Sequence, residues 1–213
     1  MNIRNAEVAG IGAIAFGVLT FMSIFVGDWP GGSYDAVTVR TYVAPSHLPI
    51  PLTATLLGLI GLAGLICLFA YLRQLAEGAR PLSSLWPQII WAVGLAGASA
   101  FAVGWGMVSA QPLAHAEAGV DLAVPTTLTY MISEATSALI FGAAPMMVGI
   151  ALVMLSLGVG QALPAWLRWS TLVAGLAGVA SLAYFPFFLL LLWNVAVGVW
   201  LLVSSRRLAR AAL

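Results

Sequence analysis

The sequence predicts an all-α membrane protein: a polytopic helix bundle of six transmembrane helices in one domain, residues 1–213, with both termini cytoplasmic. Three observations predict this fold. Only 7% of the residues are charged and 62% are hydrophobic, whereas a soluble domain carries about 25% charged residues. Six apolar segments approach or exceed the roughly 20 residues that a bilayer crossing requires. Seven of the eight arginines fall on one side of the predicted membrane.

The six apolar segments account for most of the chain. They are residues 8–27, 51–72, 87–110, 126–156, 166–183 and 187–204. No small-residue cleavage site follows the first segment, so we expect it to be a retained transmembrane helix rather than a signal peptide. The fourth segment is longer than a bilayer requires. It contains Pro145, which removes a backbone hydrogen bond and therefore predicts a kink.

Orientation follows from the arginines, because cytoplasmic loops carry an excess of basic residues. If six helices alternate, one side holds Arg4, Arg73, Arg80, Arg168, Arg206, Arg207 and Arg210. Only Arg40 lies on the other side, in the outer loop 28–50; the second outer loop is 111–125. All eight basic residues are arginine and none is lysine, which indicates a GC-rich coding sequence. We therefore predict a multi-pass protein of a bacterial inner (plasma) membrane.

Charge and cysteine content exclude several functions. The net charge is +1 and the sequence contains no basic tract, so nucleic acid is not an expected partner. The single cysteine, Cys67, excludes an intrachain disulfide and the usual multi-cysteine zinc sites. We expect the lipid bilayer to surround most of the protein surface. The sequence does not identify a cofactor.

Glu134 is the most informative polar residue, since it lies inside the fourth apolar segment. It is seven residues beyond Thr127, on the order of 10 Å from the predicted outer end of the helix. A charged side chain in hydrocarbon costs at least ~2.5 kcal/mol, so we expect Glu134 to face the bundle interior or water. Burial would favour its neutral form, in which case it serves only to join helices.

Further polar residues share the predicted depth of Glu134. Thr126, Tyr130, Ser133 and Ser137 follow one another at spacings of four, three and four, and Asn194 lies seven residues into the sixth segment. The inner halves of the helices are poorer in such residues. The sequence therefore predicts a pocket open to the outside. Its expected ligand-binding residues are Glu134, Tyr130, Ser133, Ser137 and Asn194.

The outer loops also hold metal-ligand residue types. These are His47, His115, Glu117 and Asp121, which suit zinc or manganese. Their spacing matches no established helical or finger pattern. We therefore interpret them as a solvated loop and predict no metal site.

Two stretches resemble small six-helix bacterial integral membrane proteins that form a domain family of unknown function. The first runs from Trp29-Pro-Gly-Gly-Ser-Tyr-Asp-Ala through Tyr42-Val43-Ala44 to Gly58-Leu-Ile-Gly-Leu-Ala-Gly. The second is the run from Pro145 to Gly158, followed by Leu163-Pro164-Ala165-Trp166-Leu167-Arg168 and Gly175-Leu176-Ala177-Gly178. The resemblance implies the six-helix fold and no activity.

Two functions are compatible with these features. The first is binding or transport of a small or lipophilic ligand through the outward-facing pocket around Glu134. The second is an accessory or structural subunit of a larger membrane complex, joined to a membrane-protein partner or to a second copy through faces of small residues. A hydrolase comes last, because no nucleophile can be identified, and we do not predict an enzyme.

Overall fold

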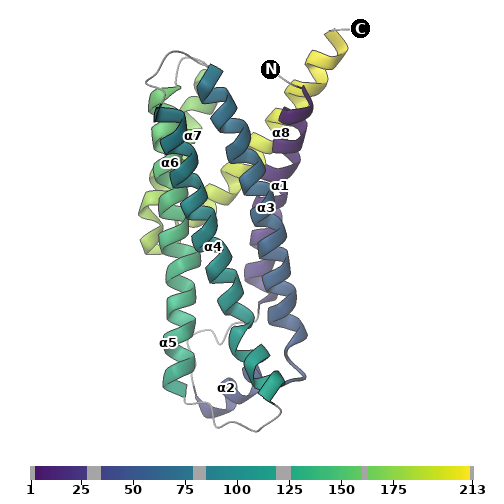
Figure 1. Ribbon diagram of the computed structural model, residues 1–213, viewed down its shortest axis with the longest axis vertical. Coiled ribbons are helices and arrows are strands. Elements are labelled where there is room, and N and C mark those ends of the chain that lie inside the picture. The colour runs from purple at the N-terminus through teal and green to yellow at the C-terminus, as the bar shows by residue number, and fades with distance from the viewer. Residues whose placement is uncertain (1–2, 28–34, 79–84, 119–125, 160–162, 212–213) are drawn as a thin grey trace.

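The computed structural model describes residues 3–27, 35–78, 85–118, 126–159 and 163–211, and these form helices with no strand among them. The elements in chain order are α1 (Ile3–Val26), α2 (Ala36–Val43), α3 (Pro49–Gly78), α4 (Leu85–Ala118), α5 (Thr126–Ser137), the π-helix η1 (Ala138–Ala143), α6 (Ala144–Gly158), α7 (Ala165–Val179), the 3₁₀-helix η2 (Ala180–Ala183) and α8 (Phe187–Ala211) (Figure 1). The predicted all-α class is therefore confirmed.

Five helical segments are long and apolar enough to cross a membrane. They are Ile3–Val26, Pro49–Gly78, Leu85–Glu117, Thr126–Gly158 and Phe187–Arg207. Each contains one of the predicted apolar segments, apart from one residue at the end of the first, and most are longer. The predicted span 166–183 corresponds to α7 and η2, where the α-helix gives way to a 3₁₀ turn before α8. The sequence did not predict α2, a short helix within the loop 28–50.

The membrane-length helices and α7 pack side by side in a closed ring. α1 packs against α3, α3 against α4, α4 against α6, α6 against α7, and both α7 and α1 against α8. Large aromatic side chains fill the centre: the ring of Phe101 lies 5.5 Å from that of Phe16 and 6.0 Å from that of Phe187. Phe16, Phe101, Trp105 and Phe187 are completely buried.

Glycines allow the closest approaches between helices. Gly12 of α1 and Gly64 of α3 lie backbone to backbone, and Gly149 of α6 lies in the same way against Gly175 and Gly178 of α7. A side chain at either crossing would meet backbone atoms of the partner helix. Small residues of α4 differ in their surroundings: Gly94 and Ala98 are buried, whereas Gly106 is exposed.

Two prolines alter helices locally, and each frees the carbonyl four residues before it. Pro145 was expected to kink its helix, and the turns directly before it, Ala138–Ala143, widen into the π-helix η1. Pro112 lies within α4 and frees the carbonyl of Val108. The hydroxyl of Tyr42 in α2 donates a hydrogen bond of 2.7 Å to that carbonyl oxygen. This bond joins α2 to α4.

The molecule has two distinct ends (Figure 1). One end, which we call the α2 end, consists of α2, α5, the beginning of α3 and the last turns of α4. At the opposite end, which we call the terminal end, α1 begins and α8 finishes. The described arginines at the terminal end belong to α1, α3, α7 and α8; they are Arg4, Arg73, Arg168, Arg206, Arg207 and Arg210. Arg40 of α2 lies at the α2 end, and Arg80 falls outside the described residues.

Candidate functional site

Glu134 lies on α5 with its side chain exposed. The expectation that it faces the interior of the bundle is therefore wrong. The buried face of α5 carries Thr129, Ser133 and Thr136, at spacings of four and three. Glu134 follows Ser133 by one residue, about 100° around the helix, and so points away from that face. α5 therefore has a polar face toward the interior of the bundle, but this face lies at a different position around the helix axis from the one that the sequence predicted.

The structure places three of the other predicted ligand residues, Tyr130, Ser133 and Ser137, on α5 and the fourth, Asn194, on α8. Ser133 is buried, Ser137 is half-buried and Tyr130 is exposed. Asn194 is fully buried in α8, where its amide nitrogen donates to the carbonyl of Leu190 at 2.9 Å and its side-chain oxygen has no partner. α8 packs against α1, α7 and α6, whereas α5 packs against α4 and α2. Whether any of the five residues binds a ligand stays a prediction.

Asn194 and Glu134 do not lie at the same depth along the bundle. A common depth was expected because each lies about seven residues from the start of a helical run. However, the ring of Tyr184, just before α8, lies 5.7 Å from the ring of Phe141. Phe141 is fifteen residues into the run that begins at Thr126. α8 therefore begins level with the middle of that run, and Glu134 lies closer to the α2 end.

The metal-ligand residue types are also spread out. His47 is half-buried and its ring lies 5.9 Å from that of Tyr42; His115 is half-buried near the end of α4, and Glu117 is exposed. Asp121 lies outside the described residues. Within the described part of the chain, no group of three or more histidine, cysteine or carboxylate side chains could hold a metal ion.

Buried polar atoms without a protein partner lie on both α4 and α5, which pack against each other. The Nδ1 atom of His115 and the hydroxyl of Thr129 are buried and have no protein partner, as is Nε2 of Gln111 one turn away. Buried polar groups of this kind are commonly hydrogen-bonded to ordered water. We therefore interpret them as structural groups of the α2 end.

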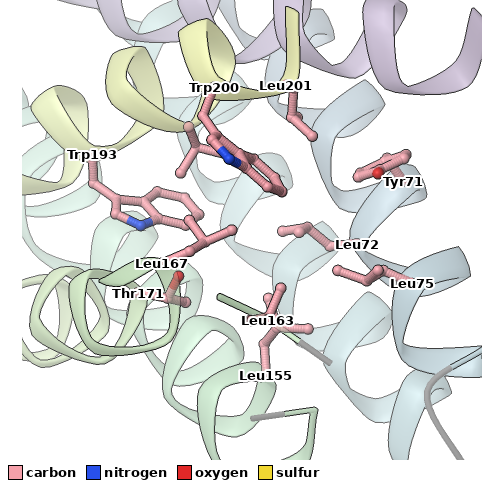
Figure 2. A pocket seen from close by; sticks show the side chains of 11 residues that line it. Tyr71, Leu72, Leu75, Leu155, Leu163, Leu167, Thr171, Trp193, Trp200 and Leu201 are labelled. Atoms are coloured by element: carbon pink, nitrogen blue, oxygen red, sulfur yellow. The ribbon is translucent and has the colours of Figure 1, made fainter. Parts of the chain in front are cut away.

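An apolar cavity lies on the other side of the molecule's midpoint, toward the terminal end (Figure 2). Figure 2 shows Trp193 and Trp200 of α8 facing Tyr71, Leu72 and Leu75 of α3 across it. The remaining lining residues are Leu155, Leu163, Leu167, Thr171, Val197 and Leu201. It contains about 280 Å³ of empty space when its open mouth is included. The interior itself is narrow, with room for about one water-sized sphere.

The ring of Trp193 lines this cavity. The residue is 6% exposed, and its indole nitrogen is buried without a hydrogen-bond partner. A buried donor in this state costs about 1–3 kcal/mol relative to one that is bonded. The sequence analysis did not predict this site, although Trp193 and Trp200 lie seven residues apart and so share one helix face. Elsewhere, Trp105 is completely buried against Gly58.

Together, the five membrane-length apolar helices and the lipid-like surface that they present define a multi-pass α-helical membrane protein. No protein-family model, curated protein or solved structure matches the chain. The resemblance to the six-helix bacterial family therefore stays an expectation, and function has to be argued from the molecule itself.

Proposed function

We propose that the protein crosses a bacterial inner membrane six times, with both termini cytoplasmic, and binds a small lipophilic ligand in the cavity between α3, α7 and α8. The sixth span is α7 with η2. Fifteen α-helical residues and four 3₁₀ residues together extend about 30 Å, the thickness of the hydrocarbon core. The grouping of six described arginines at the terminal end supports a cytoplasmic location for that end.

This topology accounts for Glu134. The inner edge of the hydrocarbon is marked by Arg168, whose carbonyl accepts a 3.0 Å hydrogen bond from the Ser156 hydroxyl. Phe141, fifteen residues before Ser156, lies about 22 Å further out and level with the turn between α7 and α8. Glu134 is another seven residues away, about 10 Å beyond that turn. Glu134 therefore lies roughly 32 Å from Arg168, at the outer edge of a hydrocarbon core roughly 30 Å thick. From this position the side chain can reach the water of the interfacial region.

The observation that supports ligand binding is the cavity itself, lined by leucines and by the rings of Trp193 and Trp200. A lipophilic molecule would bury its apolar part among these side chains. Because Glu134 is exposed, the proposal assigns the ligand to this cavity and not to the five residues predicted from sequence. The cavity lies toward the cytoplasmic end, within reach of the inner leaflet.

Native mass spectrometry of the protein released from mild detergent tests this proposal. We expect a lipophilic molecule to be retained by the wild-type protein. Leu75→Trp, at the cavity, should displace it, because the larger ring occupies the narrow space. Ile60→Trp is the matched control, since Ile60 lies on the same helix and is 58% exposed. A wild-type protein without a retained molecule, or equal retention by Leu75→Trp, would contradict the proposal.

A second candidate function, an accessory subunit of a larger membrane complex, is favoured by the outer surface of α4. Mostly small residues at spacings of four and three are exposed along it: Ala92, Ala96, Ser99, Val103, Gly106 and Ala110. Such a stripe lets a further membrane helix approach closely. Purification in mild detergent would then yield a fixed partner that Ala96→Leu and Gly106→Leu release, whereas Val18→Leu on the exposed face of α1 keeps it.

A further inference from the structure

The contact between α1 and α8 places an arginine of each helix at the same depth. The two helices pack together and run antiparallel, since α1 begins where α8 finishes (Figure 1). A Cβ atom at Gly10 would lie 3.0 Å from the carbonyl oxygen of Gly198 and 3.0 Å from Cγ of Leu202. Arg4 lies about 9 Å beyond Gly10 along α1. Arg206 lies about 6 Å beyond Leu202 and about 12 Å beyond Gly198 along α8, so the two arginines are level.

Both arginines lie on the outer surface of the bundle beside this contact. Arg4 and Arg206 are exposed, and each shares its helix face with apolar residues three, four or seven positions away. These apolar residues, which we call the α1–α8 strip, are all exposed: Val8 50%, Ile11 61%, Val199 49% and Val203 45%. Both helices are long and apolar enough to cross a membrane. The strip therefore faces lipid, and the two arginines lie where the hydrocarbon meets the head groups.

Exposed positive charge is in excess at this level. Two described carboxylates lie at the terminal end. Glu77 of α3 pairs with Arg73 at 2.8 Å, and Glu7 of α1 is half-buried. Arg4 and Arg206 are both exposed, so an anion in the head-group layer can approach them.

We propose that Arg4 and Arg206 together bind the phosphate of an anionic phospholipid whose acyl chains lie along the α1–α8 strip. A guanidinium group binds phosphate through paired N–H donors. Packed helices have axes about 8–10 Å apart, so side chains from both can reach one phosphate between them. The strip favours a lipid over free phosphate, because acyl chains add apolar contact that a free ion lacks. This inference goes beyond the cavity ligand and uses a different surface.

Native mass spectrometry in mild detergent tests the proposal. The protein is titrated with dioleoyl phosphatidylglycerol, which is anionic, or with dioleoyl phosphatidylcholine, which is zwitterionic. We expect phosphatidylglycerol to bind about five-fold more tightly or better, because the arginines repel the choline cation. Arg4→Gln and Arg206→Gln should each lower its affinity about five-fold, the effect of one basic residue at an anionic membrane. Inorganic phosphate should not displace the bound lipid.

Arg207→Gln is the matched control, since Arg207 is also exposed on α8 but lies about 100° around the helix from Arg206. It removes the same charge and should leave the affinity unchanged, as should Leu75→Trp at the cavity. Equal binding of the two lipids, or an equal loss in Arg207→Gln, would overturn the proposal. Loss of binding in Leu75→Trp would overturn it by placing the lipid in the cavity. Displacement by inorganic phosphate would overturn it by showing a site for the free ion.

Discussion

Tyr42 shows how a single side chain holds the α2 end together. Its hydroxyl lies 2.7 Å from the carbonyl oxygen of Val108, which lacks a helical donor because residue 112 is proline. The residue is 7% exposed, so water cannot easily replace the bond. A hydrogen bond from α2 thus satisfies a defect inside α4, and the position of α2 depends on it.

We predict that Tyr42→Phe lowers stability by about 1–3 kcal/mol, because a buried carbonyl loses its donor. The loss should appear as a lower apparent melting temperature in mild detergent. Tyr184→Phe is a suitable control, since Tyr184 is exposed. In a Pro112→Ala background, residue 112 regains an N–H that can bond Val108, so Tyr42→Phe should cost less. An equal cost in both backgrounds would exclude this explanation.

At the scale of elements, glycines decide how closely the helices approach. In lipid, helices associate through close packing and not through the hydrophobic effect, so backbone contact at small residues contributes much of the stability. Gly12 and Gly64 at the α1–α3 crossing provide that contact, and Gly149, Gly175 and Gly178 provide it between α6 and α7. By contrast, a Cβ at Gly106 would meet nothing within 4 Å.

Substitutions of Gly64 and Gly106 by alanine should therefore have different effects on stability. Gly64→Ala places a methyl group against the backbone of Gly12 and should destabilise the protein by about 1–3 kcal/mol or more, as overpacking does. Gly106→Ala should leave stability unchanged or raise it by up to about 1 kcal/mol, because alanine is the better helix former. Thermal unfolding of both variants in the same detergent measures the difference. If Gly64→Ala proved as stable as Gly106→Ala, the backbone contact would not contribute.

At the scale of the whole molecule, the α2 end and the terminal end are expected to lie in different compartments. In the proposed topology, the arginines at the terminal end favour the cytoplasm for that end. Helical lengths would then place α2, the beginning of α5 and the last turns of α4 outside the hydrocarbon. An exposed carboxylate on a long apolar run is consistent with this arrangement only if the run is longer than the bilayer is thick, as it is from Thr126 to Gly158.

Cysteine labelling in intact cells tests this arrangement in a Cys67→Ala background. Glu117→Cys and Glu134→Cys should react at similar rates with an impermeant thiol reagent added outside. Arg206→Cys should react only after the membrane is opened. Val103→Cys should stay unreactive in both conditions, because Val103 is exposed to hydrocarbon and not to water. Labelling of position 206 but not of position 117 from outside would show that the topology is inverted. A Glu134→Cys variant that does not react would show that residue 134 lies within the membrane.

The sequence by itself determined the all-α class, the apolar segments that form the long helices and the separation of the arginines. These depend on composition and on local apolar length, which no tertiary contact changes. It also identified Pro145 as the point where a helix departs from regular geometry. It did not place Glu134, because the side of a helix that a residue faces depends on which neighbour packs there. Only the tertiary structure decided that α4 covers Thr129, Ser133 and Thr136 and leaves Glu134 exposed. Likewise, the cavity at Trp193 exists because α3, α7 and α8 are far apart in sequence and meet only in the folded bundle.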